Sequence, residues 1–218
     1  MPTKLKTIRT AGLVISRPVA FVLVTIYMIQ SVALLYLIYD KYENERTIFR
    51  QQVQIKELKE KLVIQDIIKD LQSNISPGEL GRMADAVYTQ SKKYGYDPLL
   101  LLAVIKVEST FRKNVVSNKG AMGLMQMKPS TGSDLARRSG IGWEGKYSLF
   151  DPHYNVELGS LYLLELVHKF GDLKKALIAY NLGETETRRR LRTDRPLPEV
   201  YARKVMQAYN DFKERYES

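Results

Sequence analysis

The sequence contains no cysteine and only two histidines among its 218 residues. Without cysteine, the chain can form no disulfide, no thiolate nucleophile, no cysteine-based metal site and no lipid-modified N-terminal cysteine. The two histidines, His153 and His168, are too few for a zinc cluster and match no metal-binding motif. We also find no Walker loop, dinucleotide-binding fingerprint or nucleophile elbow. The sequence therefore favours a function that needs neither a metal nor a cofactor.

The formal net charge is +10, and its distribution limits which partners suit the chain. Residues 1–39 carry four basic and no acidic side chains, residues 40–76 carry seven of each sign, and residues 77–218 carry 23 basic and 17 acidic ones. No dense basic stripe alternates with aromatic residues, so the sequence does not favour a nucleic-acid binder. A mild positive field suits an anionic polymer such as a cell wall.

Residues 18–39 form an uncharged, apolar run of 22 residues. A helix of this length spans about 33 Å, enough to cross a bilayer core. The four basic residues before it predict a single-pass protein of the cytoplasmic (inner) membrane, with its N-terminus in the cytoplasm and the rest on the periplasmic or extracytoplasmic side. A cleaved signal peptide is the alternative, because Ser31 and Ala33 resemble a cleavage site. Residues 34–39 remain apolar beyond that site, however, so we expect an uncleaved anchor.

Residues 40–76 are rich in helix formers and carry balanced charges. Four apolar residues in this segment fit a heptad seam, namely Ile48, Ile55, Leu58 and Leu62. The phase of the pattern shifts after residue 62, and a coiled coil usually needs three or four sustained heptads. The pattern therefore predicts a long helical stalk. It could self-associate as a coiled coil and form a homo-oligomer, or fold back on the following domain.

The chain from residue 77 shows helical patterns and no convincing strand, which predicts an all-α domain. Ser76-Pro77 marks the break before it. We expect helices over 79–94, from Asp97, over 129–138, from Asp151, from Asp172 to Gly183 and over 199–216. A small hairpin within 115–127 is the one exception considered. Gly159 is expected to permit close contact between helices.

The helix that begins at Asp97 has an apolar stripe that ends in a carboxylate. The stripe consists of Leu101, Val104, Ile105 and Glu108. Glutamate is rarely buried unless it is paired or has a task. Apolar neighbours and the negative end of the helix dipole both raise the pKa of Glu108, as a general acid requires. The alternative is a helix-terminal glutamate that turns to solvent or pairs with a lysine or arginine.

The sequence GAMGLMQM at 120–127 has too many glycines for a helix and is too apolar for an ordinary surface loop. Together with other short motifs, it resembles the lytic transglycosylases, relatives of goose-type lysozyme that cleave peptidoglycan glycan strands. The motifs are VESTF at 107–111, Ser117, GAMGLMQ at 120–126, Pro129 with Thr131, NVELGSLYL at 155–163, AYNLG at 179–183 and Tyr201. The resemblance covers roughly residues 78–216 and keeps the family's order of motifs.

This resemblance implies a lysozyme-like helical catalytic domain over 77–218, after a basic N-terminus (1–17), a transmembrane helix (18–39) and a stalk with linker (40–76). It implies that Glu108 alone is the catalytic acid and base, with 1,6-anhydroMurNAc as the product and peptidoglycan as the partner. It also implies six residues that contact the substrate or surround Glu108, namely Ser109, Ser117, Gln126, Tyr180, Asn181 and Tyr201.

Four of these residues also have a purely structural interpretation. Tyr180 could be a core aromatic residue, and Tyr201 could simply pack its helix. Ser109 could be a polar group at a helix end, and Asn181 could terminate a helix.

The sequence departs from the family pattern at three positions. Lys128 stands where the family usually has an apolar residue, Lys113 replaces a common proline, and Glu184 replaces the proline that often follows the AYNxG motif. The departure at Lys128 bears on the substrate cleft. The arginine run at 188–190 is more typical of a solvated face than of a specific site.

Two other functions remain open at this stage. A hydrolase of the same fold would need a second group to activate water, and Asp134, Glu144 and Asp151 are available. A non-catalytic wall-binding scaffold would keep the fold without the reaction.

Overall fold

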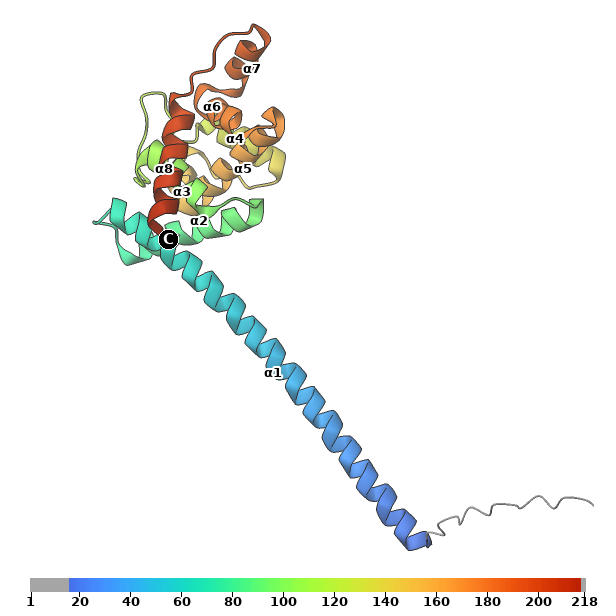
Figure 1. Cartoon of the computed structure of the whole chain (residues 1–218). Coiled ribbons are helices and arrows are strands. Elements are labelled where there is room, and N and C mark those ends of the chain that lie inside the picture. The colour runs from blue at the N-terminus through green and yellow to red at the C-terminus, as the bar shows by residue number, and fades with distance from the viewer. Residues whose placement is uncertain (1–15, 217–218) are drawn as a thin grey trace, which may run out of the picture. The chain divides into compact units, whose positions relative to one another are not determined.

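The computed structural model describes residues 16–216, and within that range it contains helices and no strand (Figure 1). The predicted all-α class is therefore confirmed. The elements are α1 (Arg17–Leu71), α2 (Pro77–Tyr94), α3 (Pro98–Ser109), α4 (Pro129–Ser139), the 3-10 helix η1 (Lys146–Phe150), α5 (Pro152–Phe170), α6 (Leu173–Leu182), α7 (Glu184–Arg192) and α8 (Val200–Tyr216). The basic residues predicted to precede the membrane lie mostly outside the described residues.

The first compact unit runs up to Ile55 and consists, within the described range, of most of α1. No side chain between residues 18 and 39 is buried, although nearly all are apolar. By its length and composition, this helix is able to cross a membrane. The sequence of α1 continues beyond the apolar run as one helix, as expected for a stalk that follows an anchor.

The second compact unit begins at Lys56, earlier than the domain start predicted at residue 77. The last turns of α1 belong to this unit because Ile64, Ile67 and Ile68 are buried in its core. Their i, i+3 and i+4 spacing places them on one helix face. The heptad residues Ile55, Leu58 and Leu62 remain exposed, so self-association through that seam stays a prediction.

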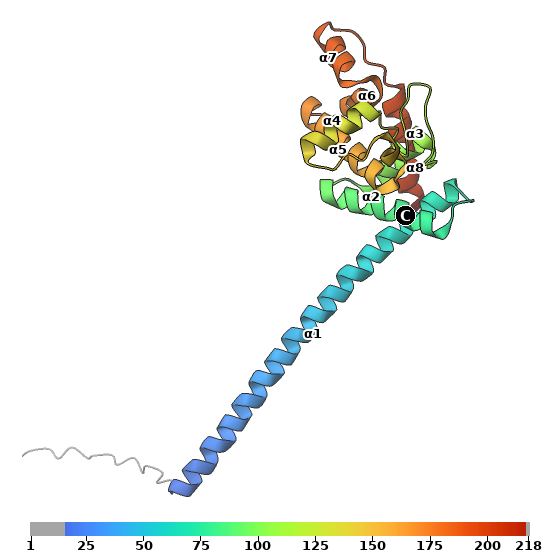
Figure 2. The same ribbon diagram turned by 180° about the vertical axis from the view of Figure 1, so that it is seen from behind.

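Helix α3 forms the centre of the second unit, and every residue from Leu99 to Ile105 is buried. Helix α8 packs along α3, while α2 packs against both α3 and α5, and α6 packs between α5 and α8 (Figures 1 and 2). The predicted break is confirmed, because Ser76 caps α2 and accepts a hydrogen bond from the backbone N–H of Glu79.

Asp97 ties α3 to α8. One carboxylate oxygen accepts a hydrogen bond from the backbone N–H of Leu99, and the other accepts one from the hydroxyl group of Tyr209 on α8 (2.7 Å). The capping residue predicted from sequence therefore also positions the last helix.

Helix α7 was not predicted, because its sequence looked like a charged, solvated run. Its charges are instead arranged at helical spacing, with Glu184 paired to Arg188, and Glu186 paired to both Arg189 and Arg190. Such i, i+3 and i, i+4 pairs stabilise a helix that has almost no apolar face. Only Thr187 in this helix is buried.

Candidate active site

Glu108 lies in the last turn of α3, one residue before the helix ends at Ser109. The two residues that follow Ser109, Thr110 and Phe111, have left-handed backbones with φ of 51° and 60°. The Phe111 side chain is 1% exposed and packs in the core, as predicted. Because Phe111 is held in the core, the end of α3 and the Glu108 side chain, three residues before Phe111, are held in place as well.

The Glu108 carboxyl is half-buried and has no ion-pair partner within the range 16–216. Burial raises the pKa of Glu108 to about 7, and a hydrogen bond from Tyr201 opposes part of that shift. The Tyr201 hydroxyl of α8 donates this bond to Oε1 at 2.5 Å. Glu108 is therefore neither turned to open solvent nor salt-bridged within the described residues, so the structural alternative considered from the sequence does not apply. Near neutral pH, this group exists in both protonation states, which acid–base chemistry requires.

Tyr180 of α6 lies close to Glu108 and holds the glycine-rich segment. Its hydroxyl donates a hydrogen bond to the carbonyl oxygen of Met125 (2.8 Å), and its ring packs on Tyr162 with centroids 5.4 Å apart. Burial, with a smaller effect from the charge of Glu108, raises the pKa of Tyr180 well above its usual value. Burial and Glu108 raise the pKa of Tyr201 in the same way. Both phenols are therefore neutral donors at physiological pH.

The glycine-rich segment folds back on itself through isolated bridges, Val116 with Met122 and Met122 with Met127, rather than through strands. Gln126 has a φ of 48°, and its side-chain amide donates hydrogen bonds to the carbonyl oxygens of Val115 and Gly123. The small hairpin considered from sequence is thus reduced to a compact turn.

Asn155 of α5 anchors this turn from inside the protein and was missed as a functional residue. Its side chain is fully buried, accepts a hydrogen bond from the Met125 backbone N–H (2.7 Å) and donates to the carbonyl oxygens of Met122 and Leu149. A polar residue within an otherwise apolar helix face was the available signal. The turn around Gln126 therefore has a rigid support.

Two glycines let this turn approach α5. Gly123 has a φ of 78°, and a Cβ there would lie 2.3 Å from Asn155 Nδ2 of α5 and 2.2 Å from the Leu149 carbonyl oxygen of η1. A Cβ at Gly159 would lie 2.4 Å from Met125 Sδ. Gly159 thus permits close approach of the glycine-rich turn to α5, whereas we had expected a contact between helices.

A cleft of about 530 Å³ opens in front of Glu108. Five of the seven residues predicted for the site line it, namely Glu108, Ser117, Gln126, Tyr180 and Asn181. Tyr201 reaches the site only through its bond to Glu108. Ser109 does not reach it, because it is 2% exposed and its hydroxyl donates to the Ile105 carbonyl oxygen. The Ser109 hydroxyl thus bonds within the last turn of α3, and its role at the site stays a prediction.

The Transglycosylase SLT domain family model matches residues 85–199, more than half of the chain. The chain belongs to this family. All of the cleft residues named above fall within the part that matches the SLT domain, and Tyr201 lies two residues beyond it.

The chain is similar to several curated membrane-bound lytic murein transglycosylases. It is 38% identical over 106 residues to membrane-bound lytic murein transglycosylase C of Klebsiella pneumoniae, covering 46% of this chain and 29% of that protein. It is 47% identical over 74 residues to an endo-type membrane-bound lytic murein transglycosylase A of the same species, covering 32% and 36%. The chain thus spans about a third of the length of the curated relatives it matches.

Two solved structures share the fold of this SLT domain. The 70 kDa soluble lytic transglycosylase of Escherichia coli aligns with a TM-score of 0.56 and 21% identity over 71% of this chain and 29% of that one. An inactive mutant of the lytic transglycosylase Slt from Pseudomonas aeruginosa aligns with a TM-score of 0.54 and 24% identity, covering 61% and 24%. At this level of identity, the likeness supports the helical fold alone.

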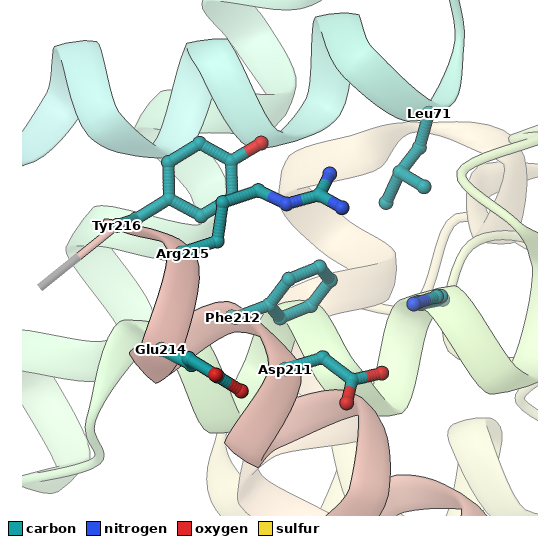
Figure 3. A pocket seen from close by; sticks show the side chains of 7 residues that line it. Leu71, Asp211, Phe212, Glu214, Arg215 and Tyr216 are labelled. Carbon is teal, nitrogen blue, oxygen red and sulfur yellow. The ribbon is translucent and has the colours of Figure 1, made fainter. Parts of the chain in front are cut away.

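A second cavity, of about 510 Å³, lies where the C-terminal ends of α1 and α8 meet Lys106 of α3, and Lys106 is its one lining residue within the SLT match (Figure 3). It is lined by Leu71, Lys106, Phe212, Tyr216 and the charged residues of the last turns of α8. The Lys106 ammonium group lies over the Phe212 ring, 4.9 Å from its centroid. None of the predicted site residues lines this cavity.

Proposed function

We propose that this protein is a membrane-anchored peptidoglycan lytic transglycosylase that cleaves the MurNAc–GlcNAc β-1,4 bond and leaves a 1,6-anhydroMurNAc end. The observation that carries the proposal is a single half-buried carboxyl, Glu108, whose pKa of about 7 suits both proton donation and proton acceptance. Glu108 is also the one acidic residue that lines the cleft within the described range.

In the first step, protonated Glu108 donates its proton to the glycosidic oxygen. The bond from this oxygen to the MurNAc anomeric carbon breaks, and its electron pair leaves with the GlcNAc 4-hydroxyl group. The acetamido carbonyl of MurNAc stabilises the positive charge at the anomeric carbon, as in substrate-assisted glycosidases. No second carboxylate is needed for this step.

In the second step, ionised Glu108 accepts the proton of the MurNAc 6-hydroxyl group. The freed O6 attacks the anomeric carbon, closes the 1,6-anhydro ring and leaves Glu108 protonated again. No water is consumed. The Tyr201 hydroxyl supports the ionised form between the steps, because it donates a hydrogen bond to Oε1.

The surroundings of the other carboxylates support this reaction over hydrolysis. Asp134 pairs with Arg137 and Arg138, and Asp151 caps α5. Glu144 is exposed, and none of these three acids lines the cleft. A group placed to activate water opposite Glu108 is therefore lacking among the acidic residues that the structure describes.

The products of glycan digestion test the proposed reaction against hydrolysis. Full-length protein in detergent, incubated with purified sacculi, should release muropeptides that carry anhydro ends. Mass spectrometry distinguishes these from reducing ends, because each anhydro end is lighter by one water. Reducing ends alone would identify a hydrolase and overturn the proposal.

We further propose that residues 18–39 anchor the protein in the inner membrane with the catalytic unit on the extracytoplasmic side. The exposed apolar helix and the membrane-bound relatives support an anchor. Because the natural chain has no cysteine, Lys175→Cys provides a unique label in the catalytic unit. A membrane-impermeant maleimide should label it in spheroplasts without lysis. Labelling only after lysis would place the unit in the cytoplasm and contradict the proposed topology.

A further inference from the structure

Two lysines line the cleft beside Glu108 and have no ion-pair partner within the described residues. Lys119 lies within residues 116–127, the segment closed by the isolated bridges, and Lys128 follows it directly. Both lysines line the cleft, and both are exposed. Many other lysines of this unit are paired, such as Lys93 with Glu157 and Lys169 with Glu184. The cleft therefore presents two uncompensated ammonium groups to its ligand.

The position of Lys128 is structurally defined. It is the residue before α4, with an extended backbone (φ −73°, ψ 135°), and Pro129 follows it at the first helical position. Proline restricts the preceding residue to extended conformations. The backbone at Lys128 therefore has a fixed direction as it leaves the glycine-rich turn, which Asn155 anchors. The long side chain of Lys128 ends in solvent at the cleft. An apolar residue at this position would remove the charge without disturbing the turn.

Sugar rings alone do not explain such a pair of charges. The rings of a glycan strand are neutral and call for hydrogen-bonding groups and apolar faces, whereas an ammonium group pairs with an anion. In peptidoglycan, the carboxylates are carried by the 3-O substituent of MurNAc. They belong either to a free lactyl group, where the peptide has been removed, or to the stem peptide.

We propose that Lys119 and Lys128 bind a carboxylate on the MurNAc 3-O substituent and make the cleft selective for anionic glycan strands. This inference rests on the proposed function, because it concerns the substrate of the same cleft. The two lysines are specificity-determining residues and take no part in proton transfer. Their contribution is made in the bound ground state and the transition state alike, so it affects KM rather than kcat.

The test compares glycan strands of equal length that carry either a charged or a neutral group on the MurNAc 3-O substituent. Amidase-treated strands keep free lactyl carboxylates, and coupling these to methylamine with a carbodiimide makes neutral strands of the same length. The full-length wild type should show a KM that is lower for the charged strands by about tenfold, since each exposed ion pair is worth up to about fivefold. The difference should shrink at high salt, because exposed charges are screened.

Variants identify the lysines as the cause. K119Q and K128Q should each raise KM for charged strands by about threefold, and the double variant by about tenfold, with kcat unchanged. The double variant should no longer distinguish charged from neutral strands. K128R should behave as wild type because it keeps the charge. K175Q is the matched control, because Lys175 is exposed on α6 and lies outside the cleft lining.

Strands with intact stem peptides distinguish the two sources of the carboxylate. A lysine-dependent preference for the amidase-treated strands assigns the free lactyl group, and a preference seen only with intact stems assigns the peptide. Wild-type cleavage with equal KM for charged and neutral strands of both kinds overturns the inference and leaves the proposed reaction standing. If the wild type forms no anhydro ends on any strand, the proposed function itself fails, and the inference fails with it.

Discussion

Replacing Glu108 by glutamine is expected to lower kcat for the release of anhydromuropeptides by about 10²–10⁴-fold, the usual contribution of a general acid or base. Glutamine keeps the shape of the side chain and can still accept the Tyr201 hydrogen bond. It cannot donate a proton to the glycosidic oxygen or accept one from the 6-hydroxyl group. Both proposed steps are therefore blocked. Quantifying anhydro ends by mass spectrometry measures the loss.

The same substitution is expected to stabilise the fold, which separates lost chemistry from lost structure. The pKa of Glu108 rises from 4.5 to about 7 on folding. The contribution of Glu108 to folding stability is therefore most favourable below pH 4.5, decreases as pH rises and levels off above pH 7. The decrease amounts to up to about 3 kcal/mol. Because glutamine has no charge to bury, E108Q should exceed the wild type in stability by up to this amount at pH 8. Chemical denaturation measures it.

The matched control is E144Q, which removes an exposed carboxylate outside the cleft. It should leave activity and stability close to those of the wild type. Full cleavage by E108Q would refute the assignment of Glu108. A wild type that binds sacculi without cleaving them would instead favour a non-catalytic wall-binding scaffold.

The sequence was sufficient to predict those features that depend on local chemistry. Asp97, Asp151 and Asp172 were recognised as helix starts, and each side chain accepts a hydrogen bond from the first turn of its helix. Helical spacing placed Glu108 on the apolar stripe of its helix, and the resemblance to the lytic transglycosylases favoured a catalytic role over a solvent-facing or paired glutamate. Caps and periodicity are encoded by residues within one or two turns of each other, so no tertiary information was needed.

The features that escaped prediction depend on partners far apart in the chain. Tyr201 was named as a site residue, but its hydrogen bond to Glu108, 93 residues away, was not predicted. Asn155 lies 30 residues from the Met125 N–H that it binds. Helix α7 has no apolar stripe, so periodicity could not reveal it. The burial of residues 64–68 in the second compact unit depends on which face of α1 meets the core. Apart from α7, whose stabilising ion pairs are local, the packing of other helices supplies the missing information in these cases.

The pH dependence of cleavage should show the ionisation of Glu108 directly. Because the proposed first step needs the protonated carboxyl, kcat/KM is expected to level off below pH 7 and to fall about tenfold per pH unit above it. At pH 9, the loss relative to the plateau is about a hundredfold. The break point corresponds to the pKa of about 7 that burial gives Glu108 in the free protein. A profile that is flat from pH 6 to pH 9 would contradict the assignment.

Tyr201→Phe should shift this break point to higher pH. The Tyr201 hydroxyl donates to the carboxylate and lowers the pKa of Glu108, so its removal leaves burial unopposed and raises the pKa. Tyr209→Phe is the matched control, because its hydroxyl bonds to Asp97 rather than to Glu108. The pH at which the stability advantage of E108Q levels off gives the same pKa without any need for activity. Measured in the Tyr201→Phe background, that pH should also rise, and a fall would contradict the proposed role of Tyr201.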